Sequence, residues 1–193
     1  DPEALARIIE SVQPAADREE AVARNAELFD VLVNNPEVSD HVAQRAKAEA
    51  LYDRAYDPAG SARQLAAVMG APPRVDGLRS LAAPTLVIHG NRDPLIDISG
   101  GRRTAELVPG ATFVEIDGMG HDLTPVFWSQ YVDAVVAHGN GRRRGVLGAG
   151  RAAVVRGGRA ESFRIGAPPV VAVVAVVGAV VAVIGIVGVV RVV

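Results

Sequence analysis

The apolar positions of the first 69 residues recur at spacings of three and four, which is the spacing of one face of a helix. Two such sets are Leu5, Ile8, Ile9 and Val12, and Leu28, Val31 and Leu32. Pro14, the Asn34-Asn35-Pro36 run and the Asp57-Pro58 pair interrupt the pattern. We therefore predict several short helices over residues 2–69, the last of them starting with Ser61 as its N-cap.

The pattern changes after the turn-rich residues 70–75. Residues 85–88, Thr-Leu-Val-Ile, form a short apolar run between Pro84 and Gly90, as expected for a strand that is buried on both faces of a parallel sheet. A helix over residues 102–107, a turn at Pro109-Gly110 and a second strand over 111–116 follow. This order predicts a βαβ unit.

A last helix is predicted over residues 125–138, with Gly139 as the residue that ends it. One side of this helix is apolar and is expected to pack on the sheet; it carries Phe127, Tyr131, Val132, Val135 and Val136. The chain thus divides into a helical region (1–75), an α/β core (76–139) and a tail (140–193) of low complexity.

Two polar residues follow the two predicted strands. Asp93 lies just after the first strand, and His121 occupies the same place after the second. The carboxyl ends of parallel strands share one edge of a sheet, where ligands and catalytic groups collect. A carboxylate beside a histidine fixes its tautomer and stabilises the imidazolium that forms when the ring takes a proton. Gly118 and Gly120 give the histidine loop the freedom to bend.

A simpler interpretation exists for each candidate residue. A single Asp before a proline is more often a turn residue or a helix cap than a catalytic group, and only the pairing of Asp93 with His121 reverses this preference. His89 is expected to support the turn after its strand, and His41 and His138 are expected to be solvated. Seven side chains can line a substrate pocket, but ordinary packing is the favoured explanation for each of them. They are Leu28, Phe29, Leu32, Tyr52, Tyr56, Met119 and Trp128.

Residues 84–138 resemble the closing third of the α/β-hydrolase fold, in which the acid and the histidine of a catalytic triad follow the last two strands. The match falls on Asp93 and His121. The helical region resembles the lid that precedes these strands, so the resemblance covers residues 2–139. It implies a C-terminal portion of an α/β-hydrolase, with a parallel sheet and flanking helices behind a helical lid.

The amino-acid sequences of three motifs are similar to those of small-molecule esterases of the aclacinomycin methylesterase kind. These motifs are His-Gly-Asn-Arg-Asp-Pro-Leu at residues 89–95, Gly-Met-Gly-His-Asp-Leu at 118–123 and Tyr-Asp-Pro-Ala-Gly at 56–60. The resemblance implies a serine ester hydrolase that acts on small-molecule esters and needs no metal or organic cofactor. His121 would be its general base and acid, and Asp93 would orient the ring.

The chain departs from the family pattern in two respects. No serine lies in a Gly-x-Ser-x-Gly motif between a strand and a helix, and the segment that supplies the oxyanion hole is not recognisable either. We therefore expect a fragment that lacks the nucleophile, with a start at Asp1-Pro2 that is processed or truncated. Two alternatives stay open: a haloperoxidase-like, epoxide-opening or dehalogenating member of the same fold, and a non-catalytic fragment or membrane-tethered remnant.

Composition excludes several other functions. The formal net charge of −2 gives no electrostatic footprint for a nucleic acid, so none is expected as a partner. The absence of cysteine excludes disulfides, thiolate nucleophiles and thiolate metal sites. A cytoplasmic location is the default expectation, and the oligomeric state stays open.

The tail contains the one candidate membrane segment. Residues 170–190 carry no charge, and as a helix they would span about 31 Å, against about 30 Å for the hydrocarbon core of a bilayer. The arginines before this segment would keep the body in the cytoplasm by the positive-inside rule. These are Arg142, Arg143, Arg144, Arg151, Arg156, Arg159 and Arg164. The alternative is that this Gly-, Arg-, Val- and Ala-rich stretch is out-of-frame translation of a GC-rich gene, and its composition favours that alternative slightly.

Overall fold

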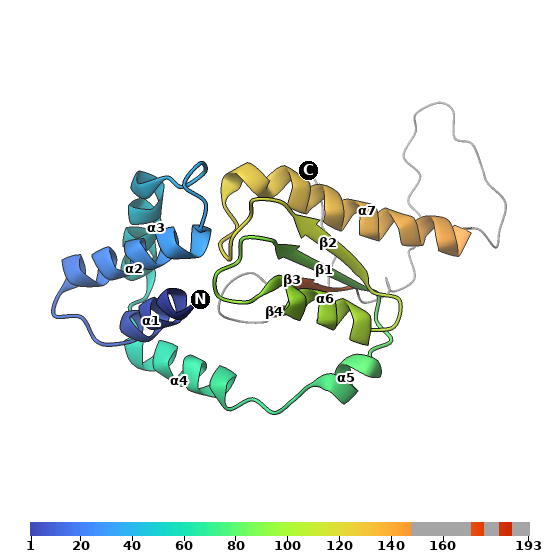
Figure 1. The fold of residues 1–193 in the computed structure, drawn as a ribbon, viewed down its shortest axis with the longest axis horizontal. Coiled ribbons are helices and arrows are strands. Elements are labelled where there is room, and N and C mark those ends of the chain that lie inside the picture. Colours follow the sequence, from blue (N-terminus) through green and yellow to red (C-terminus); the bar gives the residue numbers. More distant parts are fainter. Residues whose placement is uncertain (148–170, 176–181, 187–193) are drawn as a thin grey trace, which may run out of the picture.

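The computed structural model describes residues 1–147, 171–175 and 182–186, with side chains for residues 1–139. The first half of the chain is helical (Figure 1). Its helices are α1 (Pro2–Ser11), α2 (Arg18–Val33), α3 (His41–Arg54) and α4 (Pro58–Met69). Each of the four begins at an aspartate whose side chain accepts a backbone N–H of the first turn, which satisfies a donor that the helix leaves unpaired.

The beginning of α4 differs from the sequence prediction. The helix starts at Pro58 rather than at Ser61, and the N-cap is Asp57, whose carboxylate accepts the Gly60 N–H at 2.8 Å. Proline is favoured in the first turn of a helix because its missing N–H would have no partner there. The Asp57-Pro58 pair is therefore the start signal, and Ser61 is already inside the helix.

The helical half has its own small apolar core. Ile8 of α1 packs with Leu28 and Leu32 of α2, and Leu65 of α4 lies against them. Leu95, from the loop after the first strand, joins the same cluster. These contacts tie the helical half to the loop that carries Asp93.

The second half contains the predicted βαβ unit. After the short helix α5 (Val75–Arg79), strand β1 (Thr85–Gly90) leads through α6 (Ile98–Leu107) into β2 (Thr112–Ile116). The two strands are parallel, in a register that places Leu86 opposite Thr112 and Gly90 opposite Ile116. All six residues of β1 are buried, as the apolar run predicted. The described residues thus form a helix-rich, partial α/β fold.

Helices cover both sides of this strand pair: Figure 1 shows α6 and α7 on opposite sides of β1 and β2. The core beneath α7 (Trp128–Leu147) is formed by Leu86, Ile88, Ile116, Met119 and Phe127. Tyr131 and Val135 of α7 pack against this core, whereas Val132 and Val136 are 54% and 52% exposed. The apolar side of the helix is therefore narrower than predicted, because side chains one residue farther along are rotated by about 100°.

The last helix is also divided and extended relative to the prediction. It begins as a 3-10 turn, η1 (Pro125–Phe127), and α7 then continues through Gly139 to Leu147. Glycine ends a helix by adopting a positive φ, but among the described glycines only Gly110 and Gly118 have one. The proposed domain boundaries at residues 75 and 139 stay predictions, and α7 runs across the second of them.

Two short segments of the tail extend the sheet. Strands β3 (Val171–Ala175) and β4 (Ala182–Ile186) give the order β2-β1-β3-β4, with β3 parallel to β1 and β4 antiparallel to β3. The described residues of the candidate membrane segment 170–190 are thus strands and not a helix, in keeping with the strand preference of β-branched valine. Its other residues lie outside the described ranges. Among the described helices, none combines the length and apolar character that a membrane crossing requires.

Candidate active site

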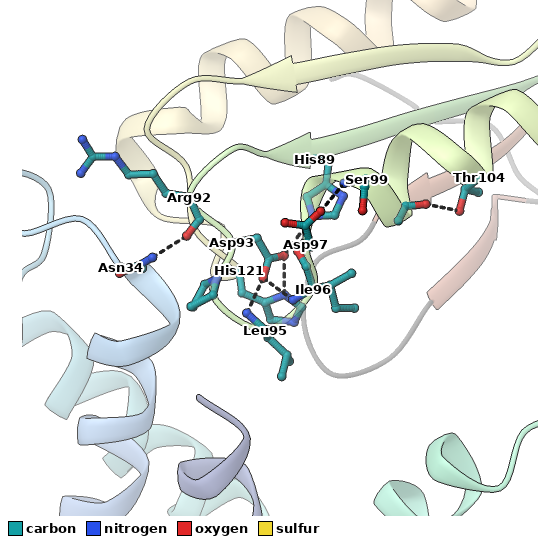
Figure 2. A network of polar contacts seen from close by, with 12 residues as sticks. Asn34, His89, Arg92, Asp93, Leu95, Ile96, Asp97, Ser99, Thr104 and His121 are labelled. Carbon is teal, nitrogen blue, oxygen red and sulfur yellow. Dashed lines mark hydrogen bonds and ion pairs between the residues drawn. The ribbon is translucent and has the colours of Figure 1, made fainter. Parts of the chain in front are cut away.

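Asp93 and His121 meet at the carboxyl edge of the strand pair. The chain leaves β1 at Gly90 and β2 at Ile116, and the Nδ1 atom of His121 lies 2.7 Å from Oδ2 of Asp93 (Figure 2). Gly118 adopts a φ of 76°, a left-handed conformation that other residues rarely accept, and this turns the second loop back towards the first. The parallel strands therefore deliver both side chains to one place.

The two loops touch through their backbones. The Arg92 N–H donates to the Met119 carbonyl at 3.0 Å, and the Asn91 N–H donates to the Ile116 carbonyl at 3.2 Å. A Cβ atom on Gly90 would lie only 2.1 Å from the Met119 oxygen. Glycine at this position is what allows the loops to approach closely enough for Asp93 to reach His121.

Both carboxylate oxygens of Asp93 have hydrogen-bond partners, and its side chain is 1% exposed. Oδ1 accepts the backbone N–H groups of Leu95 and Ile96, each at 2.9 Å. Oδ2 lies 2.7 Å from His121 Nδ1 and 3.2 Å from His89 Nε2. Burial alone would raise the pKa of Asp93, but the hydrogen bonds from His121, His89 and the Ile96 N–H hold that pKa well below its usual range. The group is therefore an anion.

The two ring nitrogens of His121 differ in their hydrogen bonds. Nδ1 carries the proton that is donated to Asp93, because an ionised carboxylate only accepts. Nε2 is buried and has no hydrogen-bond partner among the residues that the structure describes. In the neutral ring, Nε2 is thus the free base. Such a nitrogen can take a proton from a nucleophile.

The ring of His121 lines a cavity of about 340 Å³. The apolar walls come from α1 and its C-cap, α2 and α4, and consist of Ile8, Val12, Leu28, Phe29, Leu32 and Leu65. The polar lining residues besides His121 are Ser11, Lys47, Ser61, Gln64 and Asp122. An apolar cavity with a few polar groups at one place is typical of a site for a small molecule.

Three of the seven pocket candidates from the sequence line this cavity: Leu28, Phe29 and Leu32. Tyr52 and Tyr56 stack on each other and line a second, smaller cavity of about 180 Å³. Met119 belongs to the core beneath α7, and Trp128 is 55% exposed with its indole N–H bonded to the Leu123 carbonyl. Ordinary packing thus explains Met119.

The end of α2 binds both site loops, which the sequence analysis did not predict. The Leu32 carbonyl accepts the His121 N–H at 2.7 Å. The Asn34 side chain donates to the Arg92 carbonyl, and the buried Asn35 side chain donates to the Gly118 carbonyl, both at 2.8 Å. Asn34 has a φ of 44°, a conformation that asparagine tolerates better than most residues. From the sequence, the Asn34-Asn35 pair was interpreted only as a helix break. The tolerance of asparagine for a positive φ is the one sequence feature that could have indicated its role.

An ion pair from α3 adds to these contacts. The Lys47 ammonium lies 2.7 and 2.8 Å from the two oxygens of Asp122, the residue after His121. The same ammonium lies 4.2 Å from the centre of the Phe29 ring, within the range of a cation–π interaction. No sequence motif marks this pair, because Lys47 and Asp122 are far apart along the chain.

The other histidines occupy different settings. His89 is fully buried, and His41 is 80% exposed beside Asp30. His138 is half-buried on α7 rather than solvated. No group of three or more metal-binding side chains occurs in the part of the chain that the structure describes.

No protein-family model matches the chain. A solved structure that is similar to it is an esterase from a Rhodococcus species, with 26% sequence identity and a TM-score of 0.48. The similar region covers 64% of this chain and 42% of the esterase. The chain thus spans less than half the length of that protein.

The lowered pKa of Asp93 predicts a pH-dependent contribution to stability. A carboxyl group whose pKa is lower in the folded than in the unfolded state stabilises the fold above the unfolded value of about 3.9, and loses this effect as the pH falls towards the folded value. Replacing Asp93 with Asn should therefore lower the free energy of unfolding at pH 7, by about 1.5–3 kcal/mol for a charged hydrogen bond. Urea unfolding of the wild type and the variant at pH 7 and pH 3 measures this difference in the free energy of unfolding. The gap between wild type and variant should narrow at pH 3, and an unchanged gap would contradict the assignment.

Proposed function

We propose that this chain carries the acid and the histidine of a serine ester hydrolase of the α/β-hydrolase family, acting on small-molecule esters. The observation that carries the proposal is the buried Asp93–His121 pair, in which Nδ1 is bonded to the carboxylate and Nε2 has no partner within the described residues. His121 also lines an apolar cavity of a size that suits a small molecule.

The chemistry follows from the protonation state of the pair. Nε2 of His121 accepts the proton of a serine hydroxyl as that oxygen attacks the ester carbonyl, and then returns the proton to the leaving alcohol. The ring is positively charged between these steps, and the buried Asp93 anion, 2.7 Å away, stabilises that charge. Asp93 also holds the ring in the tautomer that leaves Nε2 free to accept.

The serine comes from a segment outside these 193 residues in this proposal. Ser11 and Ser61 line the same cavity as His121, but both lie in helices. The Ser11 hydroxyl donates to the Ile8 carbonyl, one turn earlier in the same helix. Neither serine lies on the turn between a strand and a helix that exposes the nucleophile in this family.

The purified chain is therefore expected to hydrolyse p-nitrophenyl butyrate no faster than the buffer does. A base without a nucleophile and without oxyanion donors lacks the two features that contribute most to acyl transfer. A longer product of the same gene, including a strand, Gly-x-Ser-x-Gly and a helix before Asp1, should hydrolyse the ester. Turnover by the 193-residue chain that His121→Ala abolishes would show that the nucleophile lies within it, and an inactive longer product would contradict the proposed function.

A further inference from the structure

His89 is a second buried imidazole at the same carboxylate. It lies on β1, and its side chain is completely buried beside Asp93 (Figure 2). Its Nε2 atom is 3.0 Å from the Ile96 carbonyl oxygen and 3.2 Å from Oδ2 of Asp93. The proposed mechanism gives this residue no role.

The contacts of His89 determine where its proton lies. A carbonyl oxygen only accepts hydrogen bonds, so the Nε2 atom that bonds to Ile96 carries the proton. The same N–H lies within reach of the Asp93 carboxylate. Nδ1 is buried and has no partner in the described part of the chain, so no acceptor is present for a second proton. His89 therefore presents a single, directed donor to the Ile96–Asp93 loop.

Helix α6 fixes the plane of this ring. A Cβ atom on the buried Gly101 would lie 2.3 Å from Nδ1 of His89 and 3.0 Å from its Cγ. The absence of a side chain at residue 101 thus leaves the space that the imidazole fills. The ring cannot keep its place if this space is closed.

We propose that His89 is a positioning residue for the Asp93–His121 pair. Its Nε2–H bonds to the Ile96 carbonyl and lies 3.2 Å from the same Oδ2 of Asp93 that accepts the Nδ1–H of His121, while Oδ1 is held by the backbone of Leu95 and Ile96. His89 thus supports the Asp93 loop at the Ile96 carbonyl and lies against the oxygen that holds His121. The inference rests on the proposed function, because it assigns His89 a role in keeping His121 in the tautomer with a free Nε2.

The tautomer of His121 is the direct test, because it can be measured without turnover. Nitrogen-15 NMR on the full chain, with labelled histidine and at alkaline pH, distinguishes the Nδ1–H form from the Nε2–H form. The wild type should show the Nδ1–H form. In His89→Leu, which removes the donor and keeps an apolar side chain of comparable size, His121 should lose this pure form and show a mixture, because a loosely held acceptor no longer selects one tautomer.

Two further variants separate positioning from simple filling of the core. His89→Gln places an amide N–H near the original Nε2 and should restore the Nδ1–H form. Gly101→Ala leaves every polar group of the site in place but displaces the His89 ring, and should give a mixture like that of His89→Leu. If His89→Leu does not fold, as judged by circular dichroism, Gly101→Ala and His89→Gln decide the question.

The controls distinguish the possible failures. His41→Leu removes another imidazole that is bonded to an aspartate, at an exposed position, and should leave His121 unchanged. Asp93→Asn should change the tautomer of His121 outright, and if it does not, the Asp93–His121 assignment and with it the proposed function are wrong. If Asp93→Asn changes the tautomer but both His89→Leu and Gly101→Ala leave it as in the wild type, only the role of His89 is overturned.

Discussion

Asp93→Asn is expected to lower kcat by about four orders of magnitude in a protein that joins this chain to a serine nucleophile, without preventing folding. An asparagine side chain can turn its NH₂ group towards Nδ1 of His121. The ring then accepts at Nδ1 and carries its proton on Nε2, where it can no longer take one from the serine. The charge of Asp93, which would stabilise the imidazolium, is lost at the same time.

Steady-state hydrolysis of p-nitrophenyl butyrate measures this effect. Asp97→Asn is the matched control, because Asp97 lies in the same loop and its side chain caps α6 through the Ser99 N–H, a bond that asparagine can also accept. We expect this control to keep near wild-type activity. Equal losses in the two variants would point to a general disturbance of the loop, and an active Asp93→Asn enzyme would show that the triad is wrongly assigned.

Gly90→Ala is expected to lower the free energy of unfolding by at least about 3 kcal/mol, more than any other substitution proposed for this chain. The added Cβ would lie 2.1 Å from the Met119 carbonyl oxygen and 2.8 Å from that of Gly120. Both obstacles are backbone atoms in the loop that carries His121, so a side-chain rotation cannot relieve the clash. The loops must separate, and with them the Arg92–Met119 hydrogen bond and the contact of Asp93 with His121 are lost.

Gly77→Ala provides the comparison for this substitution. Gly77 lies in α5, and a Cβ atom there would meet nothing within 4 Å. Alanine is a better helix former than glycine by about 1 kcal/mol, so this change should leave stability unchanged or raise it slightly. In urea unfolding, the midpoint should therefore fall for Gly90→Ala and stay the same or rise slightly for Gly77→Ala. A Gly90→Ala protein as stable as the wild type would mean that the two loops are not in contact.

The parts of the fold that could be predicted are those that depend on local pattern. The apolar run at residues 85–88 and the β-rich run at 111–116 identified β1 and β2, and parallel pairing then required Asp93 and His121 to share an edge. Helix ends were less predictable. Whether a residue such as Gly139 ends a helix depends on a backbone conformation that composition alone does not determine.

The contacts that hold the site depend on where the helical half lies against the sheet. The bond from Asn35 to Gly118 joins residues that are 83 positions apart, and the bond from Lys47 to Asp122 joins residues 75 apart. Neither polar side chain has a distinguishing neighbourhood in the sequence. His89 was expected to support the turn after its strand, but its position beside Asp93 was not predicted, because its neighbours come from the strand, the loop and the helix that follows.

The turn that ends α2 has a consequence for protein engineering. Leu32, Asn34 and Asn35 bind four backbone groups of the two site loops, so this turn serves as a template on which those loops are assembled. Exchanging the whole helical region for that of a different protein would remove the template along with the cavity wall. A graft that begins after Asp40 would replace α3 and α4 and leave the template in place. It would still need a new partner for Asp122, which Lys47 of α3 now supplies.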